Sequence, residues 1–127
     1  MSSYVLDASA LLALLNGEPG SEQVAAVLTE AVISSVNLSE VIARLADAGR
    51  SRTEISEFLE ALELEVASFD TEMAYRAGML RPLTRHLGLS LGDRTCLALG
   101  EFLRLPVMTA DRAWGELDIE IEVQIVR

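Results

Sequence analysis

Apolar and polar residues follow two alternating patterns along the chain. Some stretches repeat an apolar residue every three or four positions, which is typical of a helix, and others are short apolar runs, which are typical of strands. Strands are predicted at residues 4–6, 31–35, 64–69, 107–109 and 120–126. Helices are predicted at residues 8–15, 21–30, 37–49, 53–62, 70–87 and 91–103, with a last helical turn from Asp111. This alternation predicts an α/β fold around a mostly parallel central sheet.

Local sequence refines three of these predictions. Pro82 should kink the long 70–87 helix, because proline lacks the N–H group that a helix needs. The alternation within residues 120–126 is typical of an edge strand. The apolar segment 8–15 is too short to span a bilayer and no positively charged leader precedes it, so neither a membrane anchor nor a secretory signal is expected.

The composition indicates one soluble domain over residues 1–127. Half of the residues are hydrophobic, which is enough for a core without disulfide support. Cys96 is the only cysteine, so no intrachain disulfide can form and the cytoplasm is the expected location. The net charge of −10 argues against binding of nucleic acid through surface charge alone. Divalent cations between carboxylates and phosphates, or a basic protein partner, would suit that charge.

Four acidic residues are predicted near the carboxyl ends of strands, where open parallel sheets bind ligands. Asp7 and Asp111 directly follow predicted strands, and Glu40 lies one turn into the helix after another strand. Asp93 lies in the first turn of the 91–103 helix and projects from its apolar face, where an unpaired charge is costly. Parallel topology would gather these acids at one edge of the sheet.

Each acid also has a purely structural interpretation. Residues 37–40 and 90–93 match the capping-box pattern, and Glu40 is spaced to pair with Arg44 one turn later. The two acids that directly follow strands are suited to capping the next helix. A cap is the simpler explanation for any one of them, whereas the set of four favours a shared site.

A cluster of carboxylates suits magnesium chemistry. Mg²⁺ prefers hard oxygen ligands and is commonly held by a few carboxylates together with substrate phosphate. Helix N-termini favour the ionised form of nearby acids by about 0.3–1 kcal/mol each, and a bound metal ion activates water. No convincing Ser–His–Asp set is present, and His86, the only histidine, is interpreted as a surface residue.

Four segments together resemble the PIN domains of the VapC toxin family, in order and over essentially the whole chain. They are residues 4–10 (YVLDASA), 37–41 (NLSEV), 91–98 (LGDRTCLA) and 109–114 (TADRAW). The resemblance implies a three-layer α/β/α sandwich and an endoribonuclease that depends on Mg²⁺ or Mn²⁺. It further implies metal-activated attack of water on structured RNA, a homodimer, and a cognate antitoxin that blocks the site.

The resemblance also implies roles for the four acids of this chain. Asp7 and Asp93 would be the principal metal ligands, and Glu40 would assist them directly or through water. Asp111 would complete the acidic cluster or hold a second ion.

Three further residues receive roles from the same resemblance. The hydroxyls of Ser9 and Thr109 would orient the metal ligands. Trp114 is expected to pack the final helical turn and not to touch RNA.

Arginine residues are the candidates for contacts with RNA phosphates. No acidic residue lies between Met73 and Gly92, and two more arginines directly follow predicted site acids. The candidates from these places are Arg81, Arg85, Arg94 and Arg112. They are predicted to steer or clamp phosphates near the metal. The alternative is that they balance the charge of the Glu-rich helices nearby.

Three other functions share parts of this pattern. Phosphoacceptor domains also place an aspartate after a strand, but those families rely on a lysine, and this chain contains none. A catalytically inactive PIN-like interaction module would keep the fold without the chemistry, and the presence of all four acids argues against it. A housekeeping RNA-processing PIN nuclease would share the site, whereas the short single-domain chain favours a toxin.

Overall fold

A five-stranded sheet lies at the centre of the computed structural model, which describes residues 2–127. The strands are β1 (Tyr4–Leu6), β2 (Ala31–Ser34), β3 (Glu65–Ala67), β4 (Val107–Thr109) and β5 (Val123–Ile125). They are all parallel, in the order β3-β2-β1-β4-β5. Val5 in the middle strand pairs with Val32 on one side and Val107 on the other. The carboxyl ends of the strands therefore meet at one edge, as predicted.

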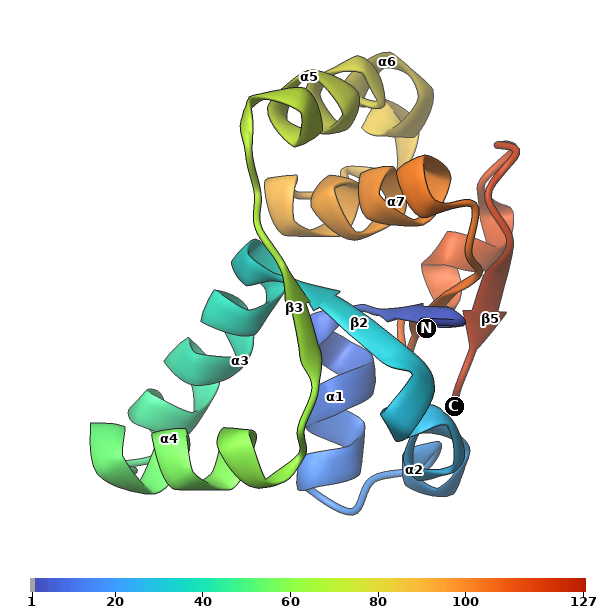
Figure 1. Ribbon diagram of the computed structural model, residues 1–127. Helices are drawn as coiled ribbons and strands as arrows, with labels where there is room; N and C mark the ends of the chain where they lie inside the picture. Colours follow the sequence, from blue (N-terminus) through green and yellow to red (C-terminus); the bar gives the residue numbers. More distant parts are fainter. Residues whose placement is uncertain (1) are drawn as a thin grey trace.

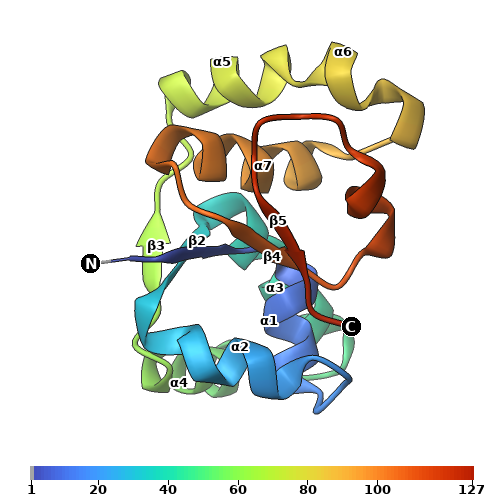
Figure 2. The ribbon, with the colours of Figure 1, turned by 90° about the vertical axis from the view of Figure 1, so that its right-hand side faces the viewer.

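Helices form layers on both faces of this sheet (Figure 1). They are α1 (Ala8–Leu15), α2 (Ser21–Val27), α3 (Ser35–Asp47), α4 (Arg52–Ala61), α5 (Thr71–Met79), α6 (Arg81–Thr84) and α7 (Leu91–Leu103). Helix α7 lies on one face with α5 and α6 outside it, and α1 and α2 lie on the other (Figure 2). Helix α3 contacts both α1 and α7. The expected α/β/α sandwich is confirmed.

The central strand β1 is buried on both faces, because alternate side chains of a strand point to opposite sides. Val5 belongs to the core that α7 covers, where Leu97 and Trp114 are also buried. Leu6 belongs to the core under α1 and α2, together with Val24. Two buried faces explain why β1 is a continuous apolar run. The expectation that Trp114 packs the final turn is confirmed.

Helix α3 begins earlier than predicted. Ser34 is its cap, and the Ser34 side chain accepts a hydrogen bond from the N–H group of Val36. Helix α3 therefore starts at Ser35, and Asn37 lies inside its first turn. The predicted capping box of residues 37–40 is wrong, because Ser34, at the end of β2, is the cap and lies three residues before Asn37.

The helix predicted over residues 70–87 is divided into three parts. Helix α5 ends at Met79, α6 starts at Arg81 with Pro82 in its first turn, and a 3₁₀ turn, η2 (Arg85–Leu87), follows. Proline favours the first turn of a helix, where no N–H partner is needed, so it starts a new helix here. The other 3₁₀ turns are η1 (Leu28–Glu30) and η3 (Arg112–Glu116).

The edges of the sheet are β3 and β5. The predicted edge strand within residues 120–126 is confirmed, although it is shorter than expected. Short edge strands limit pairing with other chains. Over residues 2–127, no helix combines the length and the apolar character needed to cross a membrane.

Candidate active site

Asp7 lies at the carboxyl end of β1, in the middle of the sheet edge. It directly precedes α1, but its side chain makes no capping hydrogen bond to that helix. Its Oδ2 atom accepts hydrogen bonds from Ser9 Oγ at 2.6 Å and from Thr109 Oγ1 at 2.9 Å. Ser9 Oγ in turn accepts from the Ala110 N–H group at 2.9 Å. Asp7 is therefore not a side-chain cap, and two uncharged hydroxyls hold its carboxylate between β1 and β4.

The environment of Asp7 opposes its ionisation. Burial, which leaves the residue 5% exposed, raises the pKa of Asp7 to about 6. Hydrogen bonds from Ser9 and Thr109 lower this pKa in part, and the negative charges of Asp93 and Glu40 raise it again. A buried acid with acidic neighbours is the electrostatic pattern of a functional site.

Glu40 reaches the same region from α3. Its Oε1 atom accepts a hydrogen bond from Asn37 Nδ2 at 2.8 Å. The same Nδ2 atom donates to the carbonyl oxygen of Gly92 in α7 at 2.9 Å. The alternative pairing of Glu40 with Arg44 is not observed, because the ion pairs within residues 2–127 lie elsewhere.

Asp93 lies in the first turn of α7 and is partly buried. Its Oδ2 atom accepts from the Ser90 N–H group at 2.9 Å, and its own N–H group donates to Ser90 Oγ at 3.2 Å. The predicted capping box at residues 90–93 is confirmed. Since its charge also raises the pKa of Asp7, Asp93 acts electrostatically on the site while it caps the helix.

Asp111 lies at the rim of the site. It is exposed, and its Oδ1 atom accepts from the Ala113 N–H group at 3.0 Å, which caps η3. Its backbone N–H group donates to Thr109 Oγ1 at 3.1 Å. The structure therefore brings Asp7, Glu40 and Asp93 together and gives Asp111 a structural contact, so its role toward a metal ion stays a prediction.

The four candidate arginines have two kinds of environment: one packs between helices and three are exposed. The Nη1 atom of Arg94 donates to the Ala77 carbonyl oxygen at 3.0 Å, and its Nε atom is buried without a partner in residues 2–127. Arg94 therefore faces α5 and packs the two helices together, which does not support its predicted phosphate contact. Arg81, Arg85 and Arg112 are exposed, and their contacts with phosphate stay predictions.

An open hollow of about 440 Å³ lies beside Ser9, whose hydroxyl contacts Asp7, and beside Asp111. Ser9 lines it together with Arg112 and Arg127. Arg127 was not among the predicted site residues, because nothing in its local sequence places it next to Ser9. A larger hollow of about 680 Å³ includes Arg104 and Glu122, but it lies at the amino ends of β4 and β5 and contains no predicted site residue.

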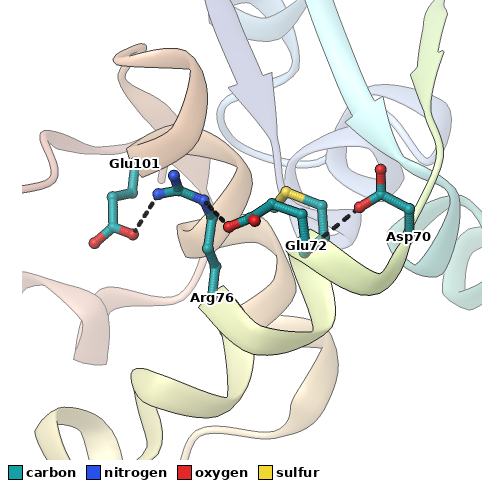
Figure 3. A network of polar contacts seen from close by, with 5 residues as sticks. Asp70, Glu72, Arg76 and Glu101 are labelled. Carbon is teal, nitrogen blue, oxygen red and sulfur yellow. Dashed lines mark hydrogen bonds and ion pairs between the residues drawn. The ribbon is translucent and has the colours of Figure 1, made fainter.

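The donor set suits a hard divalent cation, although the ligands are not pre-assembled. Within residues 2–127, no three acidic, histidine or cysteine side chains already form a metal-binding group. The ion pairs in this part of the chain join Arg76 to Glu72 and Glu101 (Figure 3). Asp7 thus has two acidic neighbours and no ion-pair partner, and its oxygen donors are those that Mg²⁺ prefers.

Two residues at this site were missed in the sequence. Asn37 was interpreted as a cap, but it is fully buried and connects α3 to α7. Gly92 is also buried, and a Cβ atom there would lie 2.2 Å from Glu40 Oε2. Glycine has a low helix propensity, so a glycine within the predicted 91–103 helix was the available signal.

A sequence profile decides the family. The profile of the PIN domain family matches residues 4–120. The chain belongs to the PIN domain family. PIN domains are generally nucleases and typically use divalent metal ions, which agrees with the acidic cluster of this PIN domain. A comparison with curated protein sequences gives no significant match.

Solved structures share the fold of this PIN domain. A chain of the DNA-bound VapBC structure from Salmonella typhimurium has a TM-score of 0.74 and 21% identity over 100% of both chains. A chain of VapBC2 from Rickettsia felis, bound to a promoter DNA fragment, has a TM-score of 0.74 and 15% identity over 98% of each chain. A chain of a toxin–antitoxin complex from Klebsiella pneumoniae has a TM-score of 0.74 and 20% identity, again over 98% of each chain.

Proposed function

We propose that this PIN domain is a Mg²⁺-dependent endoribonuclease and the toxin of a toxin–antitoxin pair. The observation that carries the proposal is the buried Asp7, which interacts with the charges of Glu40 and Asp93 and has no ion-pair partner. Such an arrangement is costly as it stands, and a divalent cation would stabilise it.

Each residue of the cluster has a role in this proposal. Asp7 and Asp93 hold the ion, and Glu40 assists them. Ser9 and Thr109 hold Asp7 through Oδ2, which leaves Oδ1 as its ligand atom. Because both hydroxyls are neutral, they orient the carboxylate without cancelling its charge. A bound Mg²⁺ or Mn²⁺ ion supplies a water of lowered pKa and neutralises charge that develops on the phosphate.

The proposed substrate is RNA, which approaches along the arginines near the cluster. Arg112 and Arg127 line the hollow beside Ser9, and Arg81 and Arg85 are exposed in α6 and η2, which precede α7 in the chain. Guanidinium groups bind phosphate through paired hydrogen bonds. These local positive charges support binding of RNA by a chain whose net charge is −10.

The proposed partner is a cognate antitoxin protein. The similar chains come from structures described as VapBC or as a toxin–antitoxin complex, which supports a partner of the same kind for this chain. A homodimer and a cytoplasmic location belong to the same proposal and rest on the family resemblance and on the single cysteine.

The test is cleavage of a mixed cellular RNA pool by purified protein with Mg²⁺, with EDTA, and after Asp93→Asn. We expect cleavage only with Mg²⁺, and a loss of more than about a hundredfold in the variant, because even the partners of metal ligands affect activity by ten- to hundredfold. Asp118→Asn is the matched control, since Asp118 is exposed and lies outside the cluster.

Two outcomes would contradict the proposal. Cleavage that survives both EDTA and Asp93→Asn would exclude a metal site at these acids. A folded, antitoxin-free protein that cleaves no RNA under any condition would favour the inactive interaction module.

A further inference from the structure

Asn37 connects α3 to α7 beside the acidic cluster. Its side chain is fully buried, and Nδ2 donates to Glu40 Oε1 at 2.8 Å and to the Gly92 carbonyl oxygen at 2.9 Å. Its Oδ1 atom is buried and accepts no hydrogen bond from residues 2–127. A buried amide with an unpartnered oxygen weakens the fold, so stability alone does not explain an asparagine here.

Gly92, in α7, lies directly against the Glu40 carboxylate. A Cβ atom at this position would lie 2.2 Å from Glu40 Oε2 and 2.6 Å from Glu40 Cδ. The backbone of Gly92 does not have a positive φ, so its conformation does not require glycine. The absence of a side chain instead permits the close approach of the Glu40 carboxylate.

Both groups that contact the Glu40 carboxylate are uncharged. An arginine or lysine at either position would also fix Glu40, but its charge would neutralise the cluster and compete with a metal ion. The Asn37 amide donates hydrogen bonds without adding charge. The negative charge of Glu40 therefore stays available next to Asp93.

We infer that Asn37 and Gly92 are positioning residues that hold the Glu40 carboxylate against the first turn of α7, where it shares a divalent cation with Asp7 and Asp93. The inference rests on the proposed function, because it requires that the cluster binds metal, and it adds how Glu40 is placed. Removing such a partner of a metal ligand changes affinity by about ten- to hundredfold.

Gly92→Ala is the sharpest test, measured as Mn²⁺ affinity by isothermal titration calorimetry in the absence of RNA. The added methyl group displaces the flexible end of Glu40, while alanine favours the helical backbone, so the variant should fold. Its Mn²⁺ affinity should fall by about ten- to hundredfold. Gly78→Ala in α5 is the matched control, because a Cβ atom there has no neighbour within 4 Å.

Asn37→Leu tests the second contact, since leucine has a similar size and lacks the amide. The Mn²⁺ affinity of this variant should also fall by about ten- to hundredfold. Both substitutions are repeated in a Glu40→Ala background, where no carboxylate remains to be positioned. Their effects on affinity should disappear there, whereas general damage to the fold would persist. Thermal unfolding of each metal-free variant accompanies the titrations.

The outcomes separate the inference from the function on which it rests. Wild-type Mn²⁺ affinity in Gly92→Ala would overturn the inference, and so would an equal loss with and without the Glu40 side chain. Wild-type protein that binds no Mn²⁺ would overturn the proposed function itself. A loss that depends on Glu40, with unfolding temperatures like that of the Gly78→Ala control, would establish the positioning role.

Discussion

Two groups of acidic side chains in this molecule are built in opposite ways. Between α5 and α7, Arg76 lies between two glutamates (Figure 3). Its Nε atom is 3.1 Å from Glu72 Oε2 and its Nη1 atom is 3.2 Å from Glu101 Oε1. The guanidinium also lies 4.8 Å from the centre of the Phe102 ring. This network is exposed, and it contains its own cation.

At the carboxyl edge of the sheet, Asp7, Glu40 and Asp93 interact electrostatically without any such cation. Neutral donors hold them instead: two hydroxyls for Asp7, an amide for Glu40 and a backbone N–H group for Asp93. A charge that the protein leaves unbalanced in a buried position is available to an external ion. The difference between a surface ion network and a candidate metal site is therefore the charge of the groups that hold the acids.

The largest expected effect concerns the stability of metal-free protein. The folded-state pKa of Asp7 is raised, so the folded state keeps its proton more readily than the unfolded state does. The contribution of the protonated Asp7 side chain to the free energy of unfolding is complete below about pH 4. It is lost as the pH rises through about 6, the folded-state pKa. Asp7→Asn should therefore stabilise the protein in EDTA at pH 7.5 by about 3 kcal/mol, and by little at pH 4.

Urea denaturation at several pH values between 4 and 7.5 measures this difference. Asp118→Asn is the control, and it should follow wild type at every pH. Mg²⁺ should stabilise wild type at pH 7.5 and have little effect on Asp7→Asn. If wild type and Asp7→Asn change in parallel with pH, the buried acid carries no unbalanced charge and the two regions do not differ as described.

Much of the fold follows from the sequence pattern, because the three central strands β1, β2 and β4 are short apolar runs, which is typical of strands covered on both faces of a parallel sheet. The prediction failed where two local signals competed. The cap of α3 is Ser34 and not Asn37, which lies inside the helix. Pro82 lies in the first turn of a new helix, α6, instead of kinking one long helix. Choosing between such signals depends on neighbouring elements, which the local pattern does not contain.

For the site, strand ends and motifs predicted that Asp7, Glu40 and Asp93 lie near one another, which agrees with the effect of Glu40 and Asp93 on the pKa of Asp7, whereas their role toward a metal ion stays a prediction. The same reasoning missed Gly92, because its role depends on how closely α3 approaches α7. The predicted phosphate contact of Arg94 is not supported for a related reason. Because α5 packs on α7, the Arg94 guanidinium donates to the carbonyl oxygen of Ala77. Spacing along one helix does not encode the distance between two helices.

A smaller effect is expected for RNA binding. Arg112→Gln combined with Arg127→Gln should weaken binding, because both arginines line the hollow beside Ser9. With single-stranded RNA, the slope of log affinity against log salt should decrease by about 0.7 for each phosphate that the variant no longer neutralises. Fluorescence anisotropy with labelled RNA measures the slope, in an Asp93→Asn background that prevents cleavage.

Arg81→Gln combined with Arg85→Gln is tested in the same way and should also weaken binding and flatten the salt dependence. Arg52→Gln, on exposed α4, is the control and should leave the slope unchanged. An unchanged slope in either double variant would mean that those arginines only balance nearby glutamates.

The smallest effect is expected for the network that contains its own cation. Arg76→Gln removes two exposed ion pairs and one interaction with an aromatic ring, and exposed pairs contribute less than about 1 kcal/mol each. Urea denaturation should show a loss of about 1 kcal/mol that shrinks in high salt, because salt screens exposed charges. Mn²⁺ affinity and RNA cleavage should not change. A loss of metal binding in Arg76→Gln would show that the two acidic groups are coupled through α7, and the separation between a structural network and a metal site would then be wrong.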